Sequence, residues 1–231
     1  MNEVLRQEKK YLMNVIESEK LRGVLEKVML EDAHNGAKGY RIRSLYFDTL
    51  DDEDYYDKIE GIELRRKIRL RTYGENADFA MLELKQKEGA YQKKRSLRLK
   101  REDAEALSRG GYSVLLKYSE PFAAECYGLL QRKCYRPKTI VEYRRRAYIA
   151  KENKIRVTFD TDLVATESSA ALFSPNLSMY SVLDPFNSVL EIKFNGFLLS
   201  YLKDLLITAD RSELSVSKYC LARRVGLKFN L

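Results

Sequence analysis

The chain has 231 residues, of which 45% are hydrophobic and 33% charged, and it carries a net charge of +8. This length and apolar content suit one sizeable folded domain and exclude an intrinsically disordered chain. The positive charge fits an anionic partner, such as nucleic acid, an anionic membrane surface or a phosphorylated small molecule, without choosing among them. We therefore expect a single domain over residues 1–231.

Cysteine and histidine are too few for the common metal sites. The three cysteines, Cys126, Cys134 and Cys220, show no CxxC spacing and no paired histidine, so neither a structural zinc site nor a disulfide framework is indicated. The single histidine, His34, falls in an expected loop, where we interpret it as solvated. No signal peptide opens the chain, and no stretch approaches the ~20 apolar residues of a membrane span. We expect a cytoplasmic protein with no membrane segment.

The first quarter of the chain predicts a strand, a helix and a second strand. Residues 7–14 are the first expected strand, and residues 40–49 are the next. The helix between them has Ser18 as its expected N-cap and Asn35-Gly36 as its expected end. Its apolar face is formed by Leu21, Val24, Leu25, Val28 and Met29.

The rest of the chain is rich in strands, with helices between them. After a helical turn at 51–60, three strands are expected at 64–73, 79–87 and 91–100, and their short turns favour antiparallel pairing. Two helical segments follow at 102–108 and 113–133, then a hairpin of 139–150 and 154–166, and a strand at 188–195. A C-terminal helix is predicted by one apolar face containing Leu198, Leu202, Leu205 and Leu206.

Charged residues alternate with apolar residues in several of these strands. The clearest case is Lys67-Ile68-Arg69-Leu70-Arg71, and similar patterns occur at 83–85, 156–160 and 191–193. Because successive strand side chains point to opposite faces, each segment has one apolar and one ionic face. Like charges two residues apart lie ~6.8 Å from each other and repel by about 2.4 kcal/mol at an effective dielectric constant of about 20. A bound polyphosphate would offset this repulsion, since Arg and Lys both match phosphate oxygens.

The strand count gives this pattern a three-dimensional interpretation. About eight strands can close into a barrel whose ionic faces surround a wet tunnel. Helices would then cover the apolar outside, which includes Ile68, Leu70, Leu82 and Leu84. The predicted fold class is α+β, an eight-stranded antiparallel β-barrel with helices packed outside. The competing interpretation is an ordinary sheet whose charged face is exposed to solvent.

Several common functional motifs are missing from the sequence. There is no GxxxxGK[ST] loop, no GxGxxG motif and no Ser-His-Asp constellation, so phosphates would be bound by side chains. No RNP-like motif is present either, and we expect no nucleic-acid partner, although the 16 tyrosines leave an RNA-binding sheet open.

Eight segments, in order along almost the whole chain, resemble the VTC domain. The first four are Glu8-Lys9-Lys10-Tyr11, 44–49, 67–71 and 83–85, and the last four are 141–148, 156–160, 190–193 and Ser217-Lys218-Tyr219. This is the polyphosphate polymerase domain of the vacuolar transporter chaperone complex, and it belongs to the triphosphate tunnel metalloenzymes. The chain is most similar to a stand-alone, bacterial-type member.

The resemblance implies a tunnel that binds ATP or another triphosphate, and inorganic polyphosphate, together with Mn²⁺ or Mg²⁺. It implies a catalytic role, the stabilisation of charge on the transferred group, for Arg69, Arg71, Arg145 and Arg156. Phosphate binding is implied for Lys10, Lys85, Ser217 and Lys218, and we expect Lys94 to join them because it lies on the strand face opposite the apolar Leu97 and Leu99. Metal binding is implied for Glu191, with Glu8 and Glu83 as weaker candidates.

Two positions depart from the family pattern. The ExExK signature of the tunnel enzymes begins with Glu, whereas Arg6 stands at that place here. The polymerases tend to carry Lys two residues before the serine of Ser-Lys-Tyr, and here that place is Ser215. The first departure disfavours hydrolysis by a two-carboxylate route, so ATP-dependent polyphosphate synthesis is the leading hypothesis. The alternatives are a tripolyphosphatase or nucleoside triphosphatase of the same fold, and a non-catalytic polyphosphate-binding module.

Overall fold

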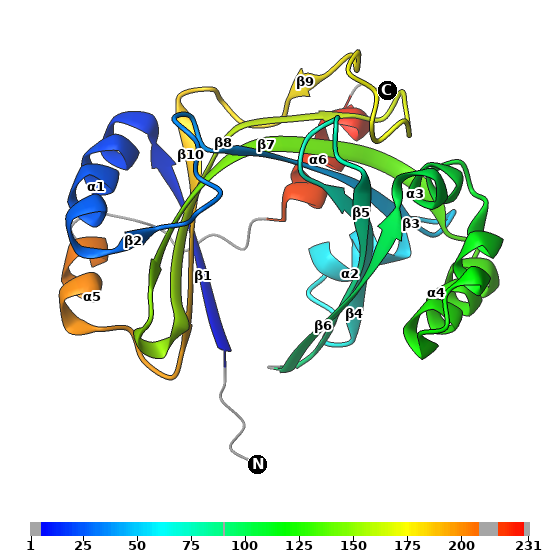
Figure 1. The fold of residues 1–231 in the computed structure, drawn as a ribbon, viewed down its shortest axis with the longest axis horizontal. Helices are drawn as coiled ribbons and strands as arrows, with labels where there is room; N and C mark the ends of the chain where they lie inside the picture. Colours follow the sequence, from blue (N-terminus) through cyan, green and yellow to red (C-terminus); the bar gives the residue numbers. More distant parts are fainter. Residues whose placement is uncertain (1–5, 90, 208–216, 229–231) are drawn as a thin grey trace. The chain divides into compact units, whose positions relative to one another are not determined.

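The computed structural model describes residues 6–89, 91–207 and 217–228, which divide into two compact units (Figure 1). Unit 1 comprises the described residues within 1–41, 143–163 and 183–216. Unit 2 comprises those within 42–142, 164–182 and 217–231. Two long strands, β7 and β8, contribute to both units. The expectation of a single domain stays a prediction.

Unit 1 is built on strands in the order β1-β10-β8-β7, with the short β2 paired to β7. The pairs β1/β10 and β10/β8 are antiparallel. Its elements are β1 (Arg6–Asn14), α1 (Val15–Val28), β2 (Leu30–Glu31), η2 (Glu152–Lys154), β10 (Asn187–Asn195), α5 (Ser200–Ile207) and parts of β7 (Arg136–Ala150) and β8 (Ile155–Thr166).

Unit 2 continues the strand order as β7-β3-β4-β5-β6, with the short β9 paired to β8. The pairs β3/β4, β4/β5 and β5/β6 are antiparallel. Its elements are β3 (Tyr40–Asp48), α2 (Glu53–Ile59), β4 (Arg65–Thr72), β5 (Phe79–Glu88), β6 (Tyr91–Lys100), α3 (Arg101–Ser108), η1 (Tyr112–Lys117), α4 (Pro121–Arg132), β9 (Tyr180–Ser181) and α6 (Lys218–Lys228). The predicted α+β class, with eight main antiparallel strands and helices, is confirmed.

The start and end of α1 differ from the sequence prediction. Asn14, not Ser18, is the N-cap, because its Oδ1 accepts hydrogen bonds from the backbone N–H groups of Ile16 and Glu17 at 2.7 and 3.3 Å. Ser18 is instead buried inside the helix, where its hydroxyl is hydrogen-bonded to that of Ser188. The helix ends at Val28, well before the expected Asn35-Gly36, because the chain turns extended at the next residue and enters β2.

One predicted helix is two elements in the structure. The segment 113–133 divides into η1 and α4, and Pro121 begins the second of them. Proline has no backbone N–H and disfavours helical geometry in the residue before it, which explains the break. Proline is well suited to the first helical position, where its N–H would have no partner.

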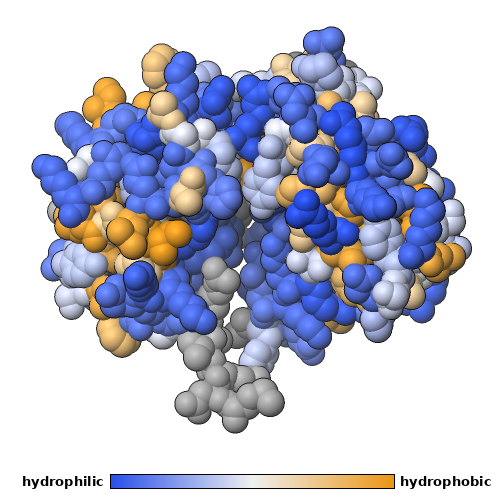
Figure 2. Space-filling view, in the orientation of Figure 1, coloured by the Kyte–Doolittle hydropathy of each residue, from blue (hydrophilic) through white to orange (hydrophobic). Residues whose placement is uncertain are grey.

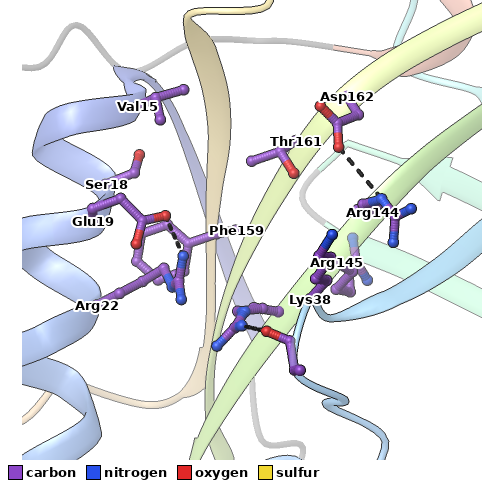
Figure 3. Close-up of a pocket in the computed structure, with 12 residues that line it drawn as sticks. Val15, Ser18, Glu19, Arg22, Lys38, Arg144, Arg145, Phe159, Thr161 and Asp162 are labelled. Atoms are coloured by element: carbon purple, nitrogen blue, oxygen red, sulfur yellow. Dashed lines mark hydrogen bonds and ion pairs between the residues drawn. The ribbon is translucent and has the colours of Figure 1, made fainter.

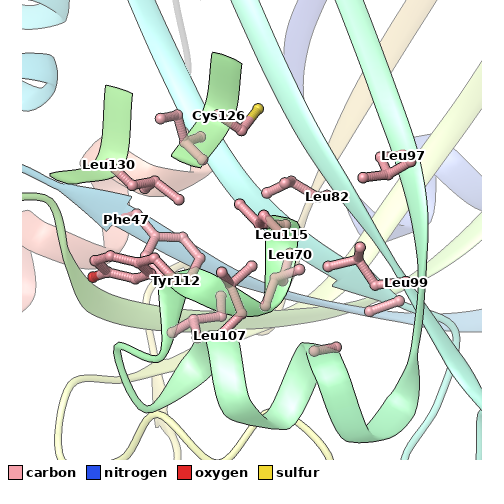
Figure 4. Close-up of a cluster of buried hydrophobic side chains, with 14 of the residues drawn as sticks. Phe47, Leu70, Leu82, Leu97, Leu99, Leu107, Tyr112, Leu115, Cys126 and Leu130 are labelled. Atoms are coloured by element: carbon pink, nitrogen blue, oxygen red, sulfur yellow. The ribbon is translucent and has the colours of Figure 1, made fainter. Parts of the chain in front are cut away.

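The apolar faces of the strands in each unit are covered by helices. In unit 2, the predicted outward residues Ile68, Leu70, Leu82 and Leu84 are fully buried, and they pack with side chains of α3, η1 and α4 (Figure 4). In unit 1, Leu21, Leu25 and Leu202 pack in one cluster with the apolar faces of β8 and β10. Leu198 and Leu205 pack against that cluster, whereas the side chain of Leu206 lies outside the described residues.

Most of the surface in view is hydrophilic, and its hydrophobic residues lie in separate patches (Figure 2). Within the described ranges, no helix is long and apolar enough to cross a membrane.

The unit 2 cluster gives a stability prediction. Leu82→Ala should lower the free energy of unfolding by about 2–5 kcal/mol, because a buried side chain is lost and the strands and helices around it collapse only partly. Leu64→Ala is the matched control, since Leu64 is 68% exposed. Urea denaturation followed by circular dichroism measures both, and equal losses would contradict the core as described.

Candidate functional site

The ionic face of unit 2 is formed by alternate residues of β4, β5 and β6. The strand register places Lys67 opposite Lys85, and Lys85 opposite Lys94, so three lysines form a row across the sheet. Like charges directly opposite each other on adjacent strands are destabilising. Within β4–β6, Glu83 is the single carboxylate on this face. The face therefore holds a concentrated positive charge with one internal counter-ion.

Glu83 is bound by cations from both neighbouring strands. Arg69 donates from Nε to Glu83 Oε2 at 2.7 Å, and Lys94 donates to the other carboxylate oxygen. Arg69 also donates from Nη1 to the Tyr46 hydroxyl at 3.1 Å, and its guanidinium lies 5.8 Å from the Tyr46 ring centre. Arg71 is buried beside them and donates to the Ser44 hydroxyl at 3.3 Å.

The acid–base properties of this cluster reflect its positive charge. Burial would raise the pKa of Glu83, but the charges of Arg69 and Arg71 and the hydrogen bond from Lys94 hold that pKa at about 2. Burial would also raise the pKa of Tyr46, yet the same two arginines bring it below its usual value. The pKa of Lys94 is lowered by burial and by the two arginines, against the effect of Glu83. The two arginines thus influence the protonation of a carboxyl, a phenol and an ammonium group around them.

The first residues of α6 lie against this cluster. The Ser217 hydroxyl accepts a hydrogen bond from the Cys220 backbone N–H at 3.3 Å, which makes Ser217 the N-cap of α6, and another from Lys67 Nζ at 2.6 Å. Lys218, the first residue of the helix, is half-buried. A cation in the first helical turn opposes the helix dipole, so helix stability does not explain a lysine there.

Tyr219 anchors α6 to the strands. Its hydroxyl donates to Asp48 Oδ2 at 2.6 Å, and its ring stacks on that of Tyr46 with centroids 5.1 Å apart. Burial and the nearby Asp48 charge raise the pKa of Tyr219, so the phenol stays protonated and keeps donating. The position of Ser217 therefore depends on a buried phenol–carboxylate bond.

The ionic face of unit 1 pairs opposite charges instead. Lys10 lies opposite Glu191, and Glu8 lies opposite Lys193. Lys10 Nζ contacts Glu8 and lies 3.8 Å from Glu191 Oε1, while Lys193 Nζ lies 2.9 Å from the same Glu191 oxygen and 4.0 Å from Glu8 Oε2. The two carboxylates thus share two ammonium groups.

Two arginines complete this face. Arg145 donates from Nε and Nη2 to the two oxygens of Asp160 at 2.6 and 2.8 Å, and Nη2 lies 3.4 Å from Glu191 Oε2. Burial would lower the pKa of Arg145, but Asp160 keeps it well above the usual value. Arg156 forms an ion pair with Asp32 at 2.6 Å and donates to Tyr40 at 3.1 Å.

The carboxylates of unit 1 supply the type of ligand atom, oxygen, and the number of carboxylates that a hard divalent cation needs. Mg²⁺ in proteins is typically held by one or two carboxylates together with phosphate oxygens and water. Glu8 and Glu191 supply such a pair, although each of their four oxygens lies within 4.0 Å of a Lys or Arg nitrogen, as both oxygens of Glu83 in unit 2 also do. Across the described ranges, no three His, Cys, Asp or Glu side chains gather as a ready-made metal site. An ion held by Glu8 and Glu191 would complete its coordination with phosphate or water oxygens.

The predicted site residues fall into two clusters, one in each unit. Unit 1 holds Glu8, Lys10, Arg145, Arg156 and Glu191, and unit 2 holds Arg69, Arg71, Glu83, Lys85, Lys94, Ser217 and Lys218. The side chain of Arg6 and the whole of Ser215, the two departures from the family pattern, lie outside the described residues.

Sequence reasoning missed Lys67, Lys193 and Tyr46 as members of these clusters. The alternation of charged and apolar residues already placed both lysines on ionic faces, beside Arg69 and Glu191, but it gave neither lysine a role in the site. Tyr46 gave no comparable signal, because tyrosine is an ordinary strand residue.

Comparison with known proteins identifies the family and the fold. The family model described as VTC domain matches residues 5–226. A Hippeastrum protein, named as a candidate adenylyl cyclase and described as having a dominant triphosphatase activity, superposes with a TM-score of 0.59 at 15% identity over 94% of this chain and 95% of its own. A candidate adenylate cyclase from Bacillus halodurans superposes with a TM-score of 0.52 at 12% identity, covering 93% of each chain. No curated protein sequence matches the chain.

The ion pairs of Glu83 predict a pH-dependent effect on stability. Glu83→Gln should lower the free energy of unfolding by about 2–3 kcal/mol at neutral pH, because Arg69, Arg71 and Lys94 lose their counter-ion. The pKa of this carboxyl is about 2 in the folded chain, below the ordinary 4.5, so its contribution is present above pH 4.5 and disappears as the pH falls toward 2. Denaturant titrations at several pH values measure the difference from the wild type.

Glu88→Gln is the control for this experiment, because Glu88 is exposed at the end of the same strand. A Glu83→Gln effect that does not shrink in acid would rule out the ion pairs as its cause.

Proposed function

Because the chain belongs to the VTC domain family of the triphosphate tunnel superfamily, we propose that it is an ATP-dependent polyphosphate polymerase. It would transfer the γ-phosphoryl group of ATP to the end of an inorganic polyphosphate chain. The observation that supports this most directly is the row Lys67, Lys85 and Lys94, whose register places like charges opposite one another. A chain of phosphates carries the repeated negative charge that such a row needs.

The proposed reaction breaks one bond and forms one. The bond between the γ-phosphorus and the oxygen that bridges it to the β-phosphorus breaks, and ADP leaves with that oxygen. A terminal oxygen of the polyphosphate chain forms the new bond to the γ-phosphorus. This oxygen is already ionised near neutral pH, so no general base is required. The single histidine, His34, is 82% exposed and hydrogen-bonded to Asp32, and the proposal gives it no role.

The cations of the two clusters would position the phosphates and offset their charge, which is most of what phosphoryl transfer asks of a protein. The γ-phosphoryl group would be stabilised during its transfer by the guanidinium groups of four arginines, Arg69, Arg71, Arg145 and Arg156. We propose that phosphate oxygens are bound by Lys10, Lys85, Lys94, Ser217 and Lys218. The geometry that fixes Arg69 against Glu83 and Tyr46 supports this role, because a fixed guanidinium needs little reorganisation when charge develops.

Glu191 and Glu8 are proposed to hold Mn²⁺ or Mg²⁺. Such an ion, when bound, would neutralise phosphate oxygens and withdraw electron density from phosphorus. Glu83 is proposed to orient Arg69 and Lys94, since its two oxygens accept from those side chains. The carboxylates thus divide into a metal-binding pair and a cation-orienting one.

Hydrolysis of triphosphates is the second candidate, favoured by the triphosphatase activity described for the Hippeastrum protein. In hydrolysis, water replaces the polyphosphate oxygen and must lose a proton, which calls for a carboxylate base or a metal-bound water. Glu8 and Glu191 could supply that base. However, Lys10 and Lys193 hold both carboxylates in ion pairs, which lowers their basicity and favours polymerisation.

Incubation of the purified chain with ATP and Mn²⁺ should yield polyphosphate and ADP, seen as a ladder on a gel stained for polyphosphate. Glu191→Gln should reduce the initial rate by about 100-fold or more, because the metal loses a charged ligand. The control Glu152→Gln changes an exposed carboxylate of the β7–β8 turn and should match the wild type. Orthophosphate without a ladder would select hydrolysis, and no turnover with any divalent metal would select a binding module.

The lysine row predicts two opposite effects of a single substitution. Lys85→Gln should raise the melting temperature of the ligand-free chain by a few degrees, because it removes the central charge of three. The same change should reduce the stabilisation that added tripolyphosphate produces. Lys93→Gln is the matched control, because Lys93 lies on the opposite face of β6 and is exposed. A lower melting temperature for Lys85→Gln would contradict repulsion within the row.

A further inference from the structure

Unit 1 contains a pocket on the sheet face opposite its ionic cluster. The pocket has a volume of about 500 Å³ and lies between α1, the 37–39 loop, β7 and β8 (Figure 3). Arg144, Arg145 and Arg146 of β7 all line it, although the guanidinium of Arg145 is bound by Asp160 of the ionic cluster. Phe159, which forms part of the floor, alternates with Asp160 along β8.

The pocket carries more positive than negative charge. Apart from Arg145, which is paired with Asp160, its cations come from three separate elements: Arg22 of α1, Lys38 of the loop, and Arg144 and Arg146 of β7. The carboxylates at its border are Glu19, which pairs with Arg22, and Asp162, whose Oδ2 lies 3.5 Å from Arg144 Nε. Lys38 is exposed and makes no hydrogen bond or ion pair within the part of the chain that the structure describes.

The loop that carries Lys38 is fastened to β7. Asn35 donates to the Ala147 carbonyl at 2.9 Å and accepts from the Ala147 N–H at 3.0 Å. Arg146 donates to the Ala37 carbonyl, so one pocket arginine itself helps to hold the loop. Gly39 has a φ of +74°, and a Cβ there would lie 2.5 Å from the Arg145 carbonyl oxygen, so a glycine is required for this close approach. The cations are therefore positioned before any ligand arrives.

We propose that this pocket binds a small, multiply phosphorylated anion at a site that adjoins the ionic cluster of unit 1 at Arg145 but is otherwise formed by other residues. Arginine forks and a lysine ammonium match phosphate oxygens, and Thr161 adds a hydroxyl at the rim. The volume suits a ligand with two or three phosphate groups. A free ion fits better than an anionic bilayer, because the carboxylates of Glu19 and Asp162 at the border of the pocket are largely exposed. They would repel a flat anionic surface before it could reach the cations of the pocket.

The test is isothermal titration of the whole chain with inorganic pyrophosphate, combined with hydrogen exchange of the 32–39 segment. Wild-type protein should show slower exchange in this segment when pyrophosphate is present. The double variant Lys38→Ala/Arg144→Ala should bind pyrophosphate at the pocket at least tenfold more weakly and lose that protection. Any binding by the ionic clusters should persist in the variant, so this result does not depend on the proposed polymerase activity.

The charge-matched control is Lys20→Ala/Lys27→Ala, which removes two exposed cations of α1 outside the pocket. Equal weakening in the control, or no protection of 32–39 in the wild type, would overturn the proposal. Phosphatidylcholine vesicles containing phosphatidylinositol bisphosphate form a second arm. If the vesicles capture the wild type but not the pocket variant, and pyrophosphate gives no protection, the ligand is a lipid headgroup and the free-anion assignment is wrong.

Discussion

The register of β4, β5 and β6 is the constraint on which the ionic face of unit 2 depends. It aligns Lys67, Lys85 and Lys94 across three strands, and like charges directly opposite one another on adjacent strands are destabilising. The opposite face offsets this cost, because Leu70, Leu82 and their neighbours are fully buried under helices. Each buried leucine contributes about 1.5–3 kcal/mol, whereas an unfavourable cross-strand pair costs about 1 kcal/mol or less. A sheet with one well-packed face can thus hold a binding surface that would not be stable alone.

The two ionic faces follow different electrostatic rules. In unit 1, register and contacts bring opposite charges together, as in Lys10 with Glu191 and Arg145 with Asp160. In unit 2, Glu83 is the one acidic residue on the ionic face of β4–β6. A neutralised face rich in carboxylates suits a metal ion, and a face with excess cations suits phosphates. The difference between the faces supports the proposed metal site in unit 1, whereas the cations proposed to bind phosphates lie in both units.

The sequence predicted most strands within a few residues, and it predicted which side chains share a face, because alternation is a local property. Lys85 and Arg69 could therefore be placed on the ionic face without a structure. Their cross-strand neighbours could not, since register depends on the turns between strands, and a shift of one residue would invert every side chain. Helix boundaries were missed where the hydrogen bonds of one capping side chain decided them, as at Asn14. The anion pocket also escaped prediction, because Lys38 and Arg144 are far apart in the sequence. They are brought together by hydrogen bonds that hold the Lys38 loop against β7.

Asp48 shows how a residue outside both ionic clusters can still determine where their side chains lie. This fully buried carboxylate accepts from the backbone N–H groups of Thr49, Asp54 and Tyr55, which ties the start of α2 to the end of β3. It also accepts from Tyr219, which ties α6 to the same point. Burial and the charge of Asp48 raise the pKa of Asp54 to about 8, so Asp54 is largely protonated at neutral pH and adds little repulsion. One buried charge therefore organises two helices, and the hydroxyl of Ser217 reaches Lys67 because that charge is in place.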